Sequence, residues 1–290
     1  MKLISVEKMK ELEAVANAGG YSYEKMMQMA GQNLARLVHE TYYFEGLRRV
    51  LGLVGGGNNG GDTLIALTEL KKSGWECSAL MLKEDINLQH LVDQLQENGG
   101  KVVNVKALNQ EVNEADLILD GIIGTGFKPP MNQATAEILK RIRDLVVGQI
   151  IVAVDCPSGV DCVTGEVSPE TLKADLTVSM EALKEGMLKF PAFESCGALA
   201  TIELGIPKKH LKAFENGKLV IDAETARSFL PARLSDSHKG NYGHLIVCGG
   251  TVNYPGAPML AGRSAYRVGT GLVECAIPER IYEAAASTNL

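Results

Sequence analysis

The chain begins with apolar residues at helical intervals. This spacing runs from about Ser5 to Glu40 and is interrupted at Gly19-Gly20. Ser22 is a residue type that favours a helix N-cap, so we expect a second helix to begin there. The sequence therefore predicts two consecutive helices ahead of the first long strand.

After these helices, short β-rich runs alternate with helical stretches. The predicted strands are residues 48–55, 77–82, 101–105, 116–122, 150–156, 176–180 and 198–204, with helices at 61–73, 88–98 and 133–145. Such alternation implies right-handed crossovers and a mostly parallel sheet. We predict an α/β fold, a Rossmann-like three-layer α/β/α sandwich, with ligands bound at the carboxyl ends of its strands.

A second region is expected to begin after Asn216-Gly217. The run KLVIDAETARSFLP predicts a new strand and helix, and HKGNYGHLIVCGG predicts a further strand that ends in glycines. About two strand-helix units are too few to close a sheet. We therefore predict one domain over residues 1–217 and an incomplete α/β segment over residues 218–290.

Composition and charge narrow the function classes. Hydrophobic residues make up 46% of the chain, which is enough for a substantial core, and the formal net charge is −6. An acidic chain gives no electrostatic reason to bind nucleic acid or an anionic membrane surface. The first residues carry charges throughout and no run approaches a membrane span, so we expect a cytoplasmic protein that handles a small molecule.

Six cysteines lie scattered along the chain without a C-x-x-C pair. None stands beside a histidine at the spacing of metal ligands. We interpret them as free thiols.

The loop after the first long strand contains a glycine pattern. Gly55, Gly57 and Gly60 form G-x-G-x-x-G between a strand and a helix, which alone suggests a dinucleotide pyrophosphate. Asp62 argues against this, because its carboxylate would repel the phosphates. Asn58 and Asn59 offer carbonyl oxygens and amide donors instead. The alternative is that the asparagines form a left-handed turn and that Asp62 caps the helix.

Two further strands end in the same kind of loop. Asp120 ends one strand and is followed by Gly124-Thr125-Gly126, while Asp155 ends another and is followed by Pro157-Ser158-Gly159 and Asp161. Because the carboxyl ends of parallel strands share one edge of a sheet, we expect these groups to converge with the first loop.

Three acids in one crevice require a cation or a retained proton. Oxygen groups such as Asn59, Asp120 and Ser158 suit a hard cation, and a carboxyl with a raised pKa suits proton transfer. We expect Asp155 to be the acid/base group, since it stands where an apolar strand ends in a loop. The alternative is that Asp155 only caps the turn that follows it.

With these motifs together, the chain resembles the NAD(P)H-hydrate epimerase family. The resemblance covers about residues 1–216 and is carried by GGGNNGGD (55–62), DGIIGTG (120–126) and VDCPSGVDCVTGE (154–166). It implies as substrate NADHX or NADPHX, the reduced cofactor hydrated at C6 of the nicotinamide ring, whose R and S epimers such enzymes interconvert. It also implies a bound potassium ion.

The resemblance assigns roles to individual residues. Potassium would be held by Asn59, Asp120 and Ser158, and Asp155 would act on the hydrated ring. The substrate would contact Asn58, Asn59, Gly60, Gly61, Asp62, Gly124, Thr125, Gly126, Phe127, Lys128, Pro129, Pro130 and Asp155.

The second region resembles the start of the ADP/ATP-dependent NAD(P)H-hydrate dehydratase, a ribokinase-like domain often fused behind the epimerase. His238-Lys239-Gly240 matches its opening motif, and Ala257 lies where that family contacts the hydrated cofactor. The nucleotide site and the catalytic aspartate would lie beyond Leu290. We therefore expect no dehydratase activity from this chain, and ADP or ATP only as a cofactor of the complete domain.

Two other functions remain open. An NAD-dependent dehydrogenase is suggested by the three glycines together with Glu84 and Asp85 near the end of the second long strand. A non-catalytic nucleotide-binding module would use the same cleft. In each case we expect a homo-oligomer with a small-molecule ligand and with neither nucleic acid nor membrane as partner.

Overall fold

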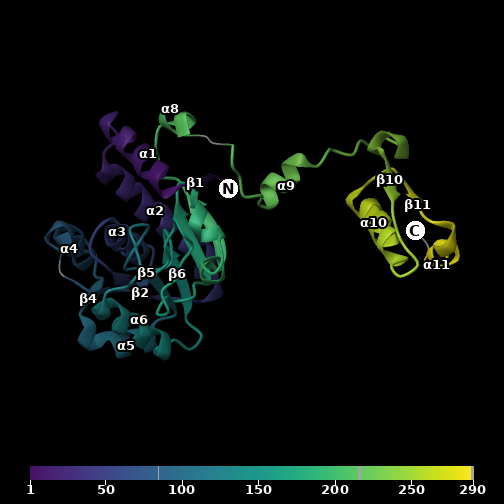
Figure 1. Ribbon diagram of the computed structural model, residues 1–290. Coiled ribbons are helices and arrows are strands. Elements are labelled where there is room, and N and C mark those ends of the chain that lie inside the picture. Colours follow the sequence, from purple (N-terminus) through teal and green to yellow (C-terminus); the bar gives the residue numbers. More distant parts are fainter. Residues whose placement is uncertain (84, 215–216, 289–290) are drawn as a thin grey trace. The chain divides into compact units, whose positions relative to one another are not determined.

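The structure is a computed structural model that describes residues 1–83, 85–214 and 217–288. The chain divides into two compact units, Met1–Thr225 and Ala226–Leu290, and each is described by itself. The first unit contains the sheet and the helices that position the candidate site (Figure 1).

A seven-stranded sheet in the order β4-β3-β2-β5-β6-β7-β9 forms the centre of the first unit. All six strand pairs are parallel. The strands are β2 (Arg49–Val54), β3 (Glu76–Met81), β4 (Lys101–Val103), β5 (Leu117–Gly121), β6 (Ile150–Val154), β7 (Leu176–Met180) and β9 (Ala198–Ile202). Because the chain runs outward from β2 to β4 and then returns to β5, the strand order reverses between β2 and β5. The carboxyl ends of these two strands are therefore the expected ligand crevice.

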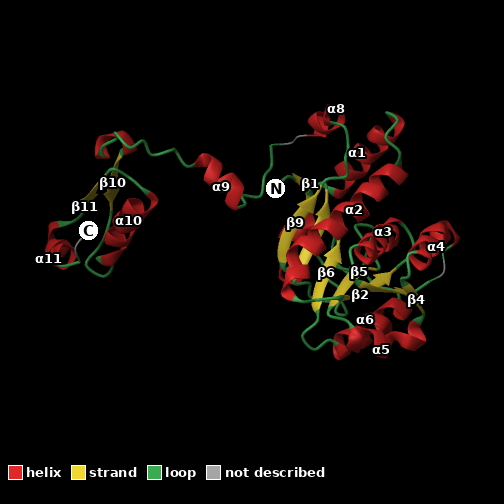
Figure 2. Cartoon of the chain, turned by 180° about the vertical axis from the view of Figure 1, so that it is seen from behind, coloured by secondary structure: helices red, strands yellow, loops and turns green. Residues whose placement is uncertain are grey.

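Helices cover both faces of this sheet (Figures 1 and 2). On one face lie α1 (Val6–Ala18), α2 (Tyr23–Tyr42), α3 (Asn58–Lys72) and α4 (Gln89–Glu97), whose apolar residues join the larger hydrophobic core. On the other lie α5 (Leu108–Glu114) and α6 (Gln133–Leu145), which supply a second core. The three-layer α/β/α sandwich predicted from the sequence is confirmed for this unit.

The two initial helices also begin as predicted. The Ser22 side chain accepts a hydrogen bond from the backbone N–H of Lys25, and Ser5 caps α1 in the same way at Lys8. The sequence pattern missed α5, in which only Leu108 and Val112 are buried. It also missed a parallel pair of two-residue strands, β1 (Leu3–Ile4) and β8 (Leu183–Lys184). Two residues are too few to show a period.

The strand predicted at residues 218–222 does not form. Leu219 makes an isolated antiparallel bridge with Lys2, and Val220 exchanges backbone hydrogen bonds with the first residue. This segment is therefore tied to the N-terminus of the first unit. Three further helices of the chain are α7 (Phe193–Cys196), α8 (Lys208–Leu211) and α9 (Ala223–Phe229).

The second unit is a small β-α-β arrangement. β10 (His244–Cys248) and β11 (Leu272–Ala276) pair in parallel and are connected by α10 (Gly256–Val268), and α11 (Tyr282–Ala286) follows. The sheet has two strands, and Leu245 and Ile246 of β10 are exposed.

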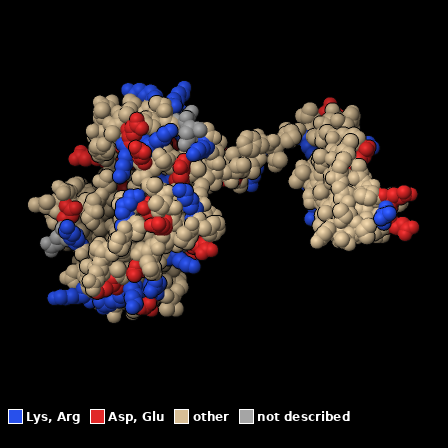
Figure 3. All heavy atoms as spheres, viewed as in Figure 1, with Lys and Arg blue, Asp and Glu red and all other residues tan. Residues whose placement is uncertain are grey.

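The cysteines agree with the expectation from the sequence, and the surface charge is mixed. On the face of the first unit shown in Figure 3, basic and acidic side chains are interspersed. All six cysteines are free thiols. In the part of the chain that the structure describes, every helix falls short of the length and apolarity needed to cross a bilayer.

Candidate active site

A cavity of about 440 Å³ opens at the strand-order reversal in the first unit. Its wall combines the start of α3 and the loops after β5 and β6 with residues of α1, α2 and β8. The polar and charged lining residues are Lys10, Glu13, Tyr23, Asn58, Asn59, Asp62, Thr125, Asp155 and Lys184. The cavity thus brings together groups that lie far apart in the sequence.

The asparagine pair begins helix α3. Gly57 is the N-cap with φ of 93°, and Asn58 and Asn59 are the first two helical residues. Neither asparagine has a positive φ, so the left-handed turn considered from the sequence is absent. Gly57 forms no side-chain cap hydrogen bond and Asp62 lies beyond the first turn, so Asp62 does not cap the helix either.

Asp62 is a buried carboxyl that faces the cavity. Only 7% of the residue is exposed. Among the described residues, its carboxyl oxygens have neither a hydrogen-bond donor nor an ion-pair partner. Burial raises the pKa of Asp62 well above its ordinary value, and the nearby Asp155 and Glu13 raise it further, against a smaller opposing effect of Lys184. The surroundings of Asp62 therefore favour its protonated form over the carboxylate.

Asp120 and Ser158 form a second buried cluster at the ends of β5 and β6. The backbone N–H of Ser158 donates to Asp120 Oδ2 over 2.8 Å, and the Ser158 hydroxyl donates to Asp120 Oδ1 over 2.5 Å. The same hydroxyl accepts the backbone N–H of Ile123. The turn Pro157-Ser158-Gly159 is thus held by Asp120, and not by Asp155 as the alternative reading supposed.

The Asp120 carboxylate lacks a protein cation. It is fully buried, and no Lys or Arg among the described residues forms an ion pair with it. Burial raises the pKa of Asp120, while the hydrogen bonds from Ser158 and Ile122 act in the opposite direction. A carboxyl in this environment requires either a proton or a bound cation.

Asn59 lies against the loop that contains Ile123. A Cβ atom on Gly124 would lie 3.2 Å from the Asn59 side-chain amide, so a larger residue there would press against this amide. One end of that amide is buried without a hydrogen-bond partner in the described chain. Since the amide oxygen and nitrogen can exchange places, this end can present an oxygen. An amide oxygen, like the oxygens of Asp120 and Ser158, suits a hard cation, and one ion shared by the three residues stays a prediction.

Asp155 is held in a constrained position at the end of β6. Its φ is 65°, which is rare for a residue other than glycine. Its Oδ1 atom accepts hydrogen bonds from the backbone N–H of Met180 over 3.0 Å and from the Lys184 ammonium. Within the described residues no donor reaches Oδ2, and Asp155 lines the cavity. The free oxygen is therefore available to a ligand.

Lys184 is a site residue that sequence reasoning did not find. Its side chain is 1% exposed, and its ammonium also donates to Ser179 Oγ and to the backbone oxygen of Met180. The lysine is carried by the two-residue strand β8, where Lys184 is paired in register with Ile4 of β1. The neighbouring sequence gives no indication that Lys184 is buried and not exposed to solvent.

Glu13 was missed as well. It lies on α1 and lines the cavity, and burial raises its pKa, with Lys184 opposing and Asp155 adding to that rise. Glu13 reaches the site because α1 packs beside the cavity, and a sequence pattern does not predict this packing.

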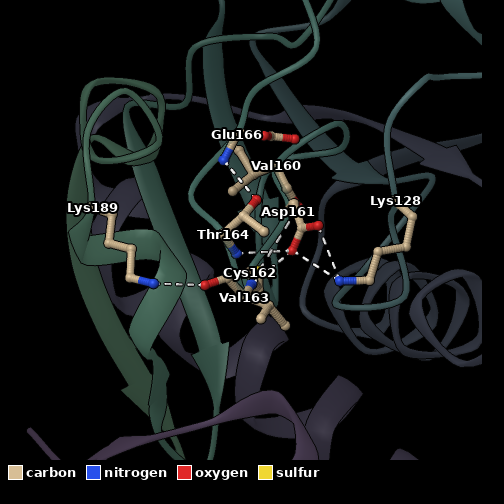
Figure 4. Close-up of polar contacts among 8 residues, drawn as sticks. All are labelled: Lys128, Val160, Asp161, Cys162, Val163, Thr164, Glu166 and Lys189. Carbon is tan, nitrogen blue, oxygen red and sulfur yellow. Dashed lines mark hydrogen bonds and ion pairs between the residues drawn. The ribbon is translucent and has the colours of Figure 1, made fainter.

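Only the first residues of the loop over residues 124–130 line the cavity. Gly124, Thr125 and Gly126 line the cavity, whereas Phe127 is buried in packing. Lys128 forms an ion pair with Asp161, over 3.0 and 3.1 Å, as Figure 4 shows. Lys128, Pro129 and Pro130 are absent from the described lining of the cavity.

Asp161 organises the loop after β6. Besides Lys128, it accepts the backbone N–H groups of Val163 and Thr164, and the backbone bonds and the lysine hold its pKa below the ordinary value against the opposing effect of burial (Figure 4). Asp161 therefore links the loop after β6 to the loop after β5 and acts away from the cavity.

Gly60 and Gly61 serve packing. A Cβ atom on Gly60 would lie 2.0 Å from the backbone oxygen of Gly55, and one on Gly61 would lie 2.5 Å from the sulfur of Met27. Both glycines allow α3 to approach its neighbours closely. Ala257 is an exposed residue of α10 in the second unit, and its contact with a ligand stays a prediction.

Of the two acidic residues that favoured a dehydrogenase, Glu84 and Asp85, the structure describes only Asp85. Asp85 accepts hydrogen bonds from the backbone and the side-chain amide of Asn87, and so caps the short helical turn Ile86–Leu88. Glu84 lies outside the described residues. Asp85 and Lys83 line a second cavity, of about 1190 Å³, that shares Gly56, Ile122 and Ile123 with the first.

This geometry defines a Rossmann-like α/β protein with a polar ligand cavity at the strand-order reversal. Residues 23–186 match the family model described as YjeF-related protein N-terminus, and the chain belongs to that family. A solved yeast structure, described as ynu0, YNL200c, has a TM-score of 0.61 over 77% of this chain and 97% of that chain, at 23% identity. At that identity the similarity supports the fold alone.

Curated relatives carry one name. A protein of Moorella thermoacetica is 30% identical over 97% of this chain and 55% of its own length, and one of Archaeoglobus fulgidus is 33% identical over 99% and 58%. Both are called bifunctional NAD(P)H-hydrate repair enzyme Nnr. The chain thus spans just over half the length of the relatives it matches.

Proposed function

We propose that the first unit is an NAD(P)H-hydrate epimerase, which interconverts the R and S forms of NADHX and NADPHX at C6 of the nicotinamide ring. The observation that carries the proposal is the pairing of two carboxyl groups in one cavity, Asp62 and Asp155, beside the amides of Asn58 and Asn59. The family match and the names of the relatives support the same substrate class.

The chemistry requires the hydroxyl-bearing carbon to become planar and to be rehydrated on either face. A carboxyl that gives and takes a proton assists loss and return of the hydroxyl group. Asp155 has a free oxygen toward the cavity and lies at the carboxyl edge of the sheet, so it is placed to act on the ring. The asparagine amides can bind the carboxamide or hydroxyl groups of the substrate.

A potassium ion is proposed at Asn59, Asp120 and Ser158. The unpartnered end of the Asn59 amide and the uncompensated Asp120 carboxylate fit an oxygen-bound monovalent cation. When bound, the ion would supply positive charge that offsets Asp120 and the phosphates of the substrate. The protein's own part is to fix the two loops through the hydrogen bonds between Asp120 and Ser158.

The second unit is proposed to belong to a ribokinase-like dehydratase domain, with the division at residues 217 and 218 taken from the sequence. The relatives' description as bifunctional supports a second activity in a longer protein, which would use ADP or ATP and contact the hydrated cofactor through Ala257. A cytoplasmic location and a homo-oligomeric state complete the proposal.

The direct test is to incubate purified R-NADHX with the 290-residue chain and to follow both epimers by chromatography. We expect the S form to accumulate faster than in buffer, with no change in the total amount of hydrate and no oxidation or reduction. Reduction of unmodified NAD in the presence of a hydroxylated substrate would instead support the dehydrogenase. Binding of the hydrate without any epimer exchange would support a non-catalytic module.

A further inference from the structure

The two carboxyl groups of the cavity have opposite surroundings. Asp155 has the Lys184 ammonium on Oδ1, and this lysine is 1% exposed, with its other hydrogen bonds going to Ser179 Oγ over 3.0 Å and to Met180 O over 3.1 Å. An ammonium held by three acceptors stays in place. The ammonium therefore fixes one carboxyl oxygen of Asp155 and leaves the other toward the cavity.

Asp62 has no such partner. It is nine-tenths buried, it faces the same cavity, and its carboxyl oxygens make no hydrogen bond to any described residue. Its carboxyl group opens into the cavity, where water or a bound ligand can supply the missing hydrogen bonds. Its surroundings favour the protonated form, because burial disfavours the charge and Asp155 repels it. Two acids whose environments differ in this way can divide the roles of proton donor and anion.

We propose that Asp62 is the catalytic residue that donates and recovers the proton at the C6 oxygen, and that Lys184 is a positioning residue that holds the Asp155 side chain in place beside the ring. The inference rests on the proposed epimerase function and deepens it. It moves the proton transfer from Asp155, the residue chosen from the sequence, to Asp62.

The reaction balances without a further reagent. The ring nitrogen forms a double bond to C6 as the bond from C6 to its hydroxyl oxygen breaks, and the Asp62 proton passes to that oxygen to give water. The ring then carries one positive charge, which the Asp155 carboxylate stabilises. Water adds to either face of C6 as its proton returns to Asp62, and the opposite epimer results. No atom is oxidised or reduced.

Other ionisable groups face this pair. Glu13 and Lys10 come from α1, and Cys156 follows Asp155 in the chain. Glu13 also has a raised pKa, but its residue is more exposed than Asp62. Cys156 is fully buried, and its hydrogen bond with Cys162 and its burial raise its pKa, so it remains a neutral thiol. Asp62 is therefore the strongest candidate for the proton donor.

The first test is Asp62→Asn in the 290-residue chain, with Asp144→Asn on the exposed surface of α6 as matched control. We expect kcat for R-NADHX epimerisation to fall about 100-fold or more with KM within about threefold, and the control to behave like the unaltered chain. If Asp62→Asn keeps more than a tenth of the original kcat, the donor role is refuted.

The stability of Asp62→Asn provides a second readout. A folded-state pKa above the unfolded value makes Asp62 a stabilising group at low pH, and this contribution is lost as pH rises through the raised pKa. The unaltered chain should therefore lose stability against urea, relative to Asp62→Asn, as the pH rises above the ordinary pKa of a carboxyl group. Equal pH dependence in both proteins would contradict a protonated Asp62, even if the unaltered chain proved not to be an epimerase.

The role of Lys184 is tested with Lys184→Met and with the surface control Lys140→Met. Because Asp155 would lose the ammonium that fixes its Oδ1 atom, kcat for R-NADHX should fall by about tenfold or more with KM within about threefold. Lys184→Arg, which keeps a cationic donor, should restore part of this loss, and the control should match the unaltered chain. An unchanged kcat in Lys184→Met, or a loss that Lys184→Arg does not reduce, would refute the positioning role. If the unaltered chain epimerises NADHX, but Asp62→Asn keeps more than a tenth of the original kcat and Lys184→Met leaves kcat unchanged, the proposed function stands and this inference fails.

Discussion

Replacing Asp155 with Asn should reduce the epimerisation rate by about 10² to 10⁴-fold, because the amide keeps the shape of the side chain but removes its negative charge. One amide oxygen can still accept hydrogen bonds from Met180 and Lys184, as Oδ1 does. We therefore expect the dissociation constant for NADPHX, measured by calorimetry, to change by less than about tenfold.

The same substitution leaves the buried Lys184 ammonium without its anionic partner, which destabilises a protein. The double variant Asp155→Asn/Lys184→Met removes both charges and serves as the control. It should recover thermal stability and remain inactive. If the double variant regained activity together with stability, the loss in the single variant would reflect folding, and Asp155 would have no part in the chemistry.

Replacing Asp120 with Asn should remove the effect of potassium on stability. The unaltered chain should melt at a higher temperature in potassium chloride than in an equal concentration of tetramethylammonium chloride, since a ligand that binds only the folded state stabilises it. Asp120→Asn lacks the carboxylate that would hold the ion, so its melting temperature should be the same in both salts.

This variant should also be less stable in either salt. The Asp120 carboxylate accepts two hydrogen bonds from Ser158, and an asparagine amide offers one oxygen in their place. The loss of one buried hydrogen bond costs on the order of 1–3 kcal/mol. A potassium-dependent rise in melting temperature that survives Asp120→Asn would place the ion elsewhere.

The central sheet was predictable because its strands are short, apolar and separated by helices. β5 and β6, for example, are continuous apolar runs that end in Asp120 and Asp155, and parallel sheets bring such ends together. The sequence placed Asp62 near the start of a helix beginning at residue 61, whereas α3 begins at Asn58 and already includes Asn59. These parts of the site depend on local sequence.

The remaining parts depend on tertiary packing. Lys184 enters the cavity from a two-residue strand, and Glu13 enters from a helix at the other end of the chain. The family resemblance also assigned residues 127–130 to the substrate; the structure pairs Lys128 with Asp161, and a contact of these residues with a substrate stays a prediction. Which face of a loop turns inward is decided by contacts between elements, and one sequence does not report those contacts.

The most direct test of the account is a crystal structure of the Asp155→Asn chain with NADPHX bound. We expect the hydrated ring in the cavity at the end of β2 and β6, with its C6 hydroxyl within hydrogen-bond distance of Asp62 and the ring beside residue 155. A ring bound instead in the cavity lined by Lys83 and Asp85, or in the second unit at Ala257, would contradict the assignment of this site.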